Sequence, residues 1–163
     1  MELQQDITDL AAQLGAILTD KSLWITTAES CTGGGISYAI TDTPGSSAYL
    51  DRAFVTYSNT AKNELLNVGE TTLQVHGAVS EQTVMEMAQG ACIAANADIA
   101  IAVSGIAGPG GATATKPVGT VWFCIRYLDE NYTYCEIFPG KRAEVRLQVI
   151  VFALKKLIKH INF

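Results

Sequence analysis

The segment Asp98–Ser104, DIAIAVS, constrains the fold more than any other part of this chain. It is a continuous apolar run with a polar residue at either end. Such a run is typical of a strand whose two faces are both covered by other elements. A helix is expected directly before it, at 81–97, because Ser80 offers an N-terminal cap and apolar residues recur there at helical spacing. We therefore expect an α/β protein.

Helices and strands are expected to alternate along the rest of the chain. Near the N-terminus, leucine and isoleucine recur at helical spacing with polar residues between them. The first half is expected to contain a helix at 3–19, a strand at 24–27, a glycine turn and a helix at 34–41, a strand at 51–57, a short helix at 61–67 and a short helical or turn segment at 70–75. The second half is expected to contain the helix at 81–97, the strand at 98–104, a hairpin with strands at 119–128 and 132–138, and a helix at 142–160. This order predicts a single domain over 1–163. Its fold is expected to be a three-layer α/β/α sandwich with a mixed, mostly parallel sheet.

The charge and hydropathy of the chain argue against two classes of partner. The net charge is −5 and no run of Lys or Arg occurs, so a nucleic-acid-binding surface is not expected. No apolar stretch reaches the ~18 residues that a membrane span needs. The N-terminus, MELQQDITDL, is acidic and amphipathic, unlike a secretory signal. We expect a cytoplasmic protein that binds neither nucleic acid nor a membrane.

The cysteines and histidines do not form a metal-binding pattern. No CxxC spacing occurs, and His76 and His160 are far apart in the chain, so no metal site is expected. Within the hairpin, a two-residue turn at Asp129–Glu130 would place Cys124 opposite Cys135. Both are expected to be free thiols in a reducing cytoplasm.

The stretch Trp24–Gly35, WITTAESCTGGG, predicts a strand, a polar turn and the start of a helix. The turn carries two candidate nucleophiles, Ser30 and Cys31. The glycines that follow leave backbone N–H groups uncovered, and the first N–H groups of a helix can bind an anion or an oxyanion. A nucleophile beside free N–H groups suits acyl-transfer chemistry. The alternative is a glycine-rich turn that only connects two elements.

A serine nucleophile needs a base, and Lys62 is the candidate for Ser30. Its pKa must fall from about 10.4 by about three units, roughly 4 kcal/mol, which burial can supply. Tyr57 lies five positions before Lys62 and can donate a hydrogen bond or relay a proton. The alternatives are a solvated lysine and a tyrosine whose ring packs at a strand end. Glu29 can orient Lys62, contact substrate or favour the positive end of the following helix.

A second glycine-rich segment, SGIAGPGG, begins at Ser104 and opens a long loop that extends to Pro117. Its N–H groups can cradle a phosphate, although its spacing matches neither a P-loop nor a dinucleotide fingerprint. Arg142 and Arg146 lie on one face of the last helix and either bind an anion or are solvated. Because ligands bind at the carboxyl ends of strands, we expect three post-strand segments, 29–35, 57–62 and 104–116, to converge.

Five blocks of sequence, in order along the chain, resemble those of a known family. They are AESCTGG (28–34), VTYSNTAK (55–62), HGAVSEQTV (76–84), SGIAGPGG (104–111) and KPVGTVWF (116–123). Together they resemble the C-terminal domain family of the competence-damage protein CinA, whose stand-alone members include bacterial nicotinamide-nucleotide amidases. The resemblance covers nearly the whole chain. One local difference is that 112–115 lacks the acidic residues of many members.

The resemblance implies a substrate and a mechanism. The substrate is nicotinamide mononucleotide, whose carboxamide is hydrolysed to give nicotinic acid mononucleotide and ammonia in pyridine nucleotide recycling. The implied site is of the serine–lysine type and needs no metal or cofactor. Family habit also suggests a homodimer.

The resemblance also assigns roles to residues by motif position. Ser30 is the nucleophile, Lys62 the general base and Tyr57 an aid to proton transfer. N–H groups around Thr32, Gly33 and Gly34 are expected to form the oxyanion hole. The remaining substrate-binding candidates are Glu29, Cys31, Ser104, Gly105 and Arg142, the last as a phosphate partner on the basis of its charge and position.

Two other functions fit the same sequence. The first is a non-catalytic nucleotide-binding or competence- and damage-associated interaction domain, which would release no ammonia from nicotinamide mononucleotide. The second is an amidase for another small carboxamide, which would not depend on the substrate phosphate. Cys31 is the second candidate nucleophile if Ser30 is not the first.

Overall fold

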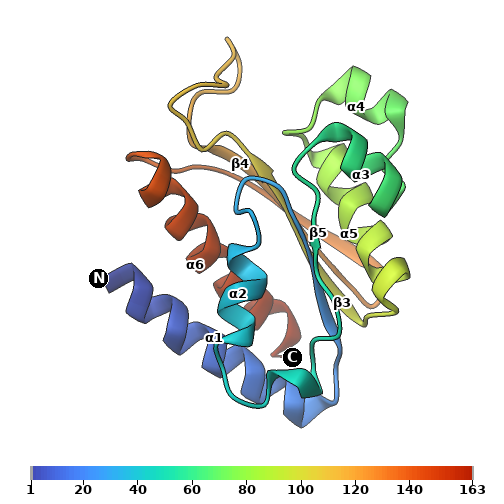
Figure 1. Ribbon diagram of the computed structural model, residues 1–163, viewed down its shortest axis with the longest axis vertical. Coiled ribbons are helices and arrows are strands. Elements are labelled where there is room, and N and C mark those ends of the chain that lie inside the picture. The colour runs from blue at the N-terminus through green and yellow to red at the C-terminus, as the bar shows by residue number, and fades with distance from the viewer. Residues whose placement is uncertain (1, 163) are drawn as a thin grey trace.

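The computed structural model describes residues 2–162 and contains a five-stranded sheet with helices on both faces (Figure 1). The elements are α1 (Glu2–Lys21), β1 (Ile25–Glu29), α2 (Gly35–Thr41), the 3₁₀ turn η1 (Ser46–Ala48), β2 (Phe54–Val55), α3 (Asn59–Leu66), α4 (Glu70–His76), α5 (Glu81–Ala95), β3 (Ile99–Gly105), β4 (Thr120–Tyr127), β5 (Glu130–Ile137) and α6 (Arg142–Ile161). None of the helices in this described part is long and apolar enough to cross a membrane.

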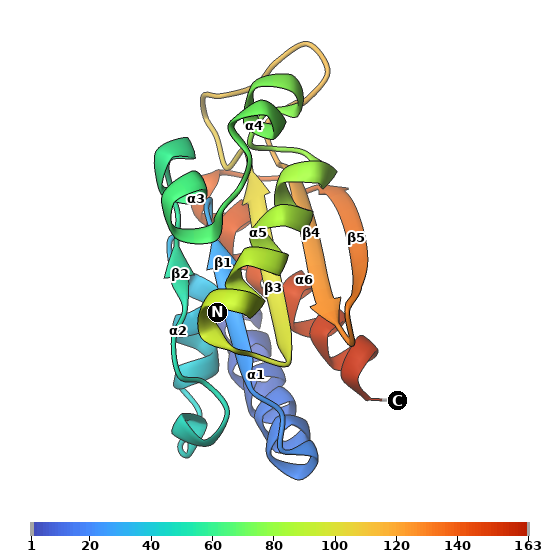
Figure 2. The same ribbon diagram turned by 90° about the vertical axis from the view of Figure 1, so that its right-hand side faces the viewer.

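The strands lie in the order β2-β1-β3-β4-β5 (Figure 2). β1 pairs in parallel with both β2 and β3, while β4 pairs antiparallel with β3 and with β5. β4 alone therefore runs against the direction shared by the other strands of the sheet. The predicted mixed, mostly parallel sheet is confirmed.

Helices α1, α2 and α6 cover one face of the sheet, and α3, α4 and α5 lie on the other (Figure 1). β3 is buried between the two layers, as its apolar sequence predicts. Ile99, Ile101 and Val103 belong to the core under α1 and α6, whereas Ala100 and Ala102 belong to the core under α5. Because side chains alternate along a strand, one face of β3 is bulky and the other allows α5 to approach closely. The three-layer sandwich is confirmed.

Two local predictions were wrong. The strand expected at 51–57 is only Phe54–Val55, because this edge strand pairs with just Ala28 and Glu29 at the end of β1. The hairpin turn falls at Leu128 and Asp129, which adopt φ values of 55° and 60°. Cys124 therefore pairs with Thr133, and Cys135 with Trp122. Cys124 and Cys135 are free, as expected, and so are Cys31 and Cys92.

Candidate active site

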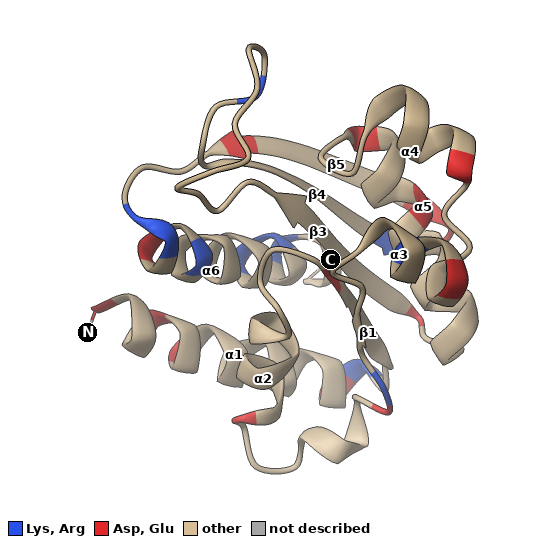
Figure 3. Cartoon of the chain, turned by 45° about the horizontal axis from the view of Figure 1, so that its top comes forward, with Lys and Arg blue, Asp and Glu red and all other residues tan. Residues whose placement is uncertain are grey.

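The side chains of Ser30 and Lys62 meet at the carboxyl end of β1. Lys62 Nζ lies 2.9 Å from Ser30 Oγ and donates a hydrogen bond to it. Both side chains are buried, and Lys62 is only 1% exposed. The basic residue of α3 and those in the first turns of α6 belong to helices on opposite faces of the sheet (Figure 3). The predicted pairing of nucleophile and base is present in the geometry.

Local structure fixes the position of the Lys62 ammonium group. Ser58 caps α3 by accepting a hydrogen bond from the Ala61 N–H at 3.0 Å, which places Lys62 in the first turn of the helix. Lys62 Nζ also donates to the carbonyl oxygens of Thr56 at 2.8 Å and Tyr57 at 3.4 Å. An ammonium group has three protons, so each one has an acceptor here.

Burial lowers the pKa of Lys62 from 10.5 to about 8. The cause is desolvation, which disfavours the charged form, and no carboxylate among its hydrogen-bond partners opposes it. A lysine with this pKa can be neutral near physiological pH and can accept a proton. The alternative of a solvated surface lysine is wrong.

The Glu29 side chain points toward α2 rather than toward Lys62 or the pocket. It is fully buried, and its carboxylate accepts bonds from the Ile36 N–H at 2.7 Å and the Ser37 N–H at 2.9 Å. The hydroxyls of Thr32, at 2.7 Å, and Thr27, at 3.1 Å, donate to the same carboxylate. Glu29 therefore anchors the start of α2, and the geometry does not support its expected contact with substrate.

The glycine turn presents fewer free N–H groups than expected. Gly33 and Gly34 adopt φ values of 59° and 99°, which favour glycine. The Gly33 N–H donates to the Ser30 carbonyl at 3.0 Å and is therefore occupied. Within residues 2–162, the N–H groups of Thr32 and Gly34 have no acceptor, and the N–H of Cys31 interacts only with its own thiol. Of the oxyanion donors predicted around Thr32 to Gly34, the N–H groups of Thr32 and Gly34 therefore remain available, and that of Gly33 does not.

A cavity of about 250 Å³ opens beside Ser30 Oγ, where the predicted loops converge. Seven of the predicted site residues line it: Ser30, Cys31, Tyr57, Lys62, Ser104, Gly105 and Arg142. Glu29, Thr32, Gly33 and Gly34 do not. The cavity is also lined by Ala78, Val79 and the loop residues 106–108 and 110–111. Ala78 and Val79 lie inside the block HGAVSEQTV, so the motif contained a signal for them.

The Tyr57 hydroxyl bonds to Arg142 and not to the nucleophile or the base. Arg142 Nη2 donates to it at 3.0 Å, and Arg142 Nη1 donates to the Gly108 carbonyl at 2.7 Å. Tyr57 is 59% exposed, and its contact with Lys62 comes from its backbone carbonyl. The structure therefore brings Tyr57 to the pocket but does not place its hydroxyl for proton transfer.

The other candidate groups either lie outside the cavity beside Ser30 or are unreactive. Arg146 is bonded to the carbonyls of Cys31 and Thr32 instead of an anion or solvent. Burial raises the pKa of the Cys31 thiol to about 11, so this thiol is protonated near neutral pH and is a poor nucleophile. His160, in the last turn of α6, stacks on Tyr132 of β5, and His76 is the exposed last residue of α4.

Comparisons with known proteins agree with this geometry. Residues 7–161 match the family model of the CinA C-terminal domain. The chain is 54% identical over 157 residues to the nicotinamide-nucleotide amidohydrolase PncC of Enterobacter agglomerans, with 96% of each chain covered. It is 50% identical over 153 residues to PncC of Escherichia coli K12, with 93% of each chain covered.

Solved structures show the same fold. The crystal structure of the competence damage-inducible protein A from Klebsiella pneumoniae superposes with a TM-score of 0.93 at 39% identity, covering 96% of this chain and 97% of that chain. The family model, the relatives and this structure thus agree over nearly the whole chain. This chain belongs to the CinA C-terminal domain family.

Proposed function

We propose that this protein is a nicotinamide-nucleotide amidohydrolase that converts nicotinamide mononucleotide to nicotinic acid mononucleotide and ammonia. The observation that carries the proposal is the buried hydrogen bond of 2.9 Å between Lys62 Nζ and Ser30 Oγ. Relatives that are 54% and 50% identical carry the name nicotinamide-nucleotide amidohydrolase, which supports the substrate.

The reaction begins with neutral Lys62. Two of its N–H bonds point to the carbonyls of Thr56 and Tyr57, so its lone pair faces Ser30 Oγ. Lys62 takes the serine proton while Ser30 Oγ attacks the carboxamide carbon. The resulting oxyanion accepts hydrogen bonds from N–H groups of the turn after Ser30, with the free N–H of Thr32 as the main donor.

The protonated Lys62 then completes the first half of the reaction. It returns its proton to the amide nitrogen, the C–N bond breaks, and ammonia leaves behind an ester on Ser30. A water molecule gives a proton to Lys62 and attacks this ester, and Lys62 returns the proton to Ser30 Oγ as the acid departs. The positive charge of the pyridinium ring makes the carboxamide more electrophilic.

The cavity fits part of this substrate. Its volume of about 250 Å³ is small for a ligand pocket and suits the pyridine ring. Arg142 lies at the edge of the cavity, and a guanidinium has five N–H donors, of which two are used here. Arg142 therefore remains able to bind the phosphate of the nucleotide, beside the glycine loop.

The test is ammonia release from nicotinamide mononucleotide by the pure protein, with and without a chelator. We expect release in both conditions and none from Ser30→Ala, which should still bind the nucleotide. Nicotinamide riboside, which lacks the phosphate, should be a much poorer substrate. Equal turnover of the riboside would favour an amidase for other small carboxamides.

A folded wild-type protein that releases no ammonia would contradict the proposal and favour the non-catalytic binding domain. The homodimer stays a prediction, which analytical ultracentrifugation can check separately.

A further inference from the structure

Arg146 reaches from α6 to the turn that carries the nucleophile. Its Nε donates to the carbonyl of Cys31 and its Nη2 to the carbonyl of Thr32, both at 3.1 Å. A single guanidinium thus holds two successive peptide groups directly after Ser30. Arg146 and Cys31 are 115 positions apart in the chain. No sequence motif indicated it, because α6 and the turn are adjacent only in the folded protein.

This contact sets the direction of one free N–H group. The Cys31 carbonyl and the Thr32 N–H belong to the same planar, trans peptide and point in opposite directions. Holding the carbonyl against Arg146 therefore directs the Thr32 N–H away from α6. Within the described residues this N–H has no acceptor. A cation bonded to the carbonyl also polarises the peptide and strengthens its N–H as a donor.

We propose that Arg146 is a positioning residue that fixes the turn after Ser30 so that the Thr32 N–H stabilises the oxyanion. The inference rests on the proposed amidase function and adds to it a residue outside the pocket lining. Arg146 is not among the residues that line the cavity beside Ser30. It acts through the carbonyl groups of Cys31 and Thr32. It therefore stabilises the transition state and leaves the binding of the substrate in the ground state largely unchanged.

Arg146 is not needed to attach α6 to the protein. Its neighbours Val145, Val149 and Ile150 are buried in the core between α6 and the sheet. This apolar face supplies far more binding surface than two hydrogen bonds to carbonyls. We therefore expect variants at Arg146 to fold, with only a modest loss of stability.

The experiment compares Arg146→Ala and Arg146→Lys with the wild type. Losing one oxyanion donor lowers kcat by about 10²–10³-fold, so we expect Arg146→Ala to lose about 10²-fold in kcat with KM changed less than about threefold. Arg146→Lys should lose roughly tenfold, because a single ammonium group cannot hold both carbonyls as a planar guanidinium does. Guanidinium chloride at millimolar concentration should restore part of the kcat of Arg146→Ala.

Two controls separate this role from a general effect of charge or stability. Lys155→Ala removes an exposed cation from the same helix, and it should keep both kcat and KM. Guanidinium at the same concentration should not activate the wild type or Lys155→Ala. Thermal unfolding of each variant shows whether any loss of activity follows a loss of structure.

A second readout does not depend on the natural substrate. A fluorophosphonate forms a P–O bond with Ser30 Oγ, fluoride leaves, and Lys62 takes the serine proton, so the same N–H groups assist the reaction. Labelling of Arg146→Ala, followed by mass spectrometry, should be about 10²-fold slower than that of the wild type. If the wild type is labelled but releases no ammonia from the nucleotide, the proposed substrate is wrong while the role of Arg146 can still be measured.

The inference is overturned if folded Arg146→Ala keeps kcat and its labelling rate within about threefold of the wild type. A loss confined to KM would overturn it as well, because it would place Arg146 in ground-state binding. If Arg146→Ala does not fold, Arg146→Lys decides: an unchanged kcat in that variant contradicts the requirement for two bonds.

Discussion

Lys62 Nζ and Ser30 Oγ are joined by a hydrogen bond of 2.9 Å although the two residues are 32 positions apart. Ser30 is held at the end of β1, where its N–H donates to the Val103 carbonyl of β3 at 3.1 Å. Lys62 is held by the capped first turn of α3. The bond therefore forms across the ends of neighbouring parallel strands, a common place for ligand sites in such sheets.

The two adjacent candidate nucleophiles should respond very differently to substitution. Ser30→Ala should lower kcat by about 10³-fold or more, because no covalent intermediate can form. Cys31→Ala should keep kcat within about fivefold, since burial raises the pKa of this thiol to about 11 and leaves it protonated. Steady-state ammonia release measures both. The reverse order of effects would make Cys31 the nucleophile.

Activity should rise with pH through the pKa of Lys62, which is about 8. The base must be neutral, so kcat/KM should increase about tenfold per unit below pH 8 and level off above it.

The free energy of unfolding should rise over a higher pH range. Between pH 8 and 10.5, Lys62 is protonated in the unfolded chain but largely neutral in the folded chain, so the unfolded chain binds more protons and an increase in pH favours folding.

Lys62→Met tests the same assignment by removing the base. It should lose about 10²–10⁴-fold in kcat/KM and the rise in activity near pH 8. Lys155→Met, at an exposed position, is the matched control and should keep the wild-type profile. A wild-type profile that is flat from pH 6 to 9 would argue against Lys62 as the base.

Sequence patterns predicted the layers of the fold from local signals, whereas the Ser30–Lys62 pair was predicted from the need of a serine nucleophile for a base and from the family resemblance. The apolar run at 98–104 requires burial on two faces, and the cap at Ser80 locates the start of α5. The hairpin register could not be predicted in this way. It depends on Leu128 adopting a left-handed conformation, which a leucine rarely does, so local propensity favoured the wrong turn.

Side-chain directions within the site were the least predictable feature. Whether Glu29 faces Lys62 or α2 depends on which donors surround it, and four of them converge at the start of α2. The roles of Arg146 and the Tyr57 hydroxyl depend on contacts with a helix and a turn more than 80 positions away. Contacts at such separations leave no periodic signal in a single sequence.

Glu29→Gln should destabilise the protein strongly. Each carboxylate oxygen accepts one backbone N–H and one threonine hydroxyl, whereas an amide group would present its own N–H groups to one of these pairs. The loss of a buried, fully bonded charge should cost about 3 kcal/mol, or a fall in Tm of roughly 6–12 °C. Urea unfolding measures it. Glu136→Gln, on the exposed edge of β5, should change stability by less than about 0.5 kcal/mol.

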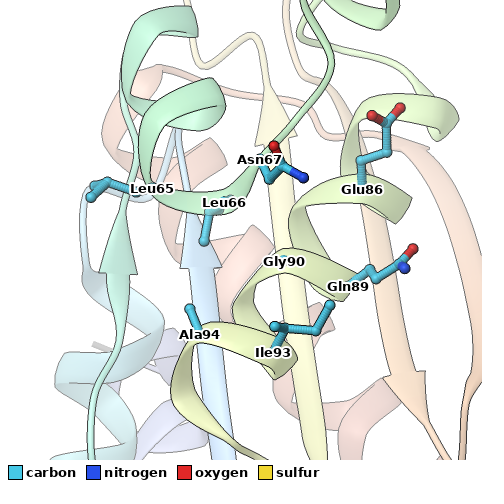
Figure 4. Close-up of a pocket in the computed structure, with 8 residues that line it drawn as sticks. All are labelled: Leu65, Leu66, Asn67, Glu86, Gln89, Gly90, Ile93 and Ala94. Atoms are coloured by element: carbon cyan, nitrogen blue, oxygen red, sulfur yellow. The ribbon is translucent and has the colours of Figure 1, made fainter.

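Gly90→Ala should also destabilise the protein, through the contact between α5 and the end of α3 (Figure 4). A Cβ atom at Gly90 would lie 1.9 Å from the Leu66 carbonyl oxygen, so α3 would have to move. We expect a net loss of about 1–3 kcal/mol despite the better helix propensity of alanine. Gln89→Ala, at the adjacent exposed position, should be neutral. Because α3 carries Lys62, kcat should fall as well; an unchanged kcat would show that the first turn of α3 stays in place.

Tyr57→Phe distinguishes a proton relay from a substrate-binding role. In the structure the hydroxyl accepts a hydrogen bond from Arg142 Nη2 at 3.0 Å, so its removal frees the guanidinium proposed to bind the substrate phosphate. We expect KM for nicotinamide mononucleotide to rise by roughly three- to tenfold, with kcat within about threefold, because a lost positioning contact affects binding of ground state and transition state alike.

Arg142→Ala should raise KM further. It should also weaken the effect of adding Tyr57→Phe, since both substitutions act on one contact. A relay requires the opposite result: kcat would fall by about 10²-fold in Tyr57→Phe with KM unchanged. Steady-state kinetics of the two single variants and the double variant separate these outcomes.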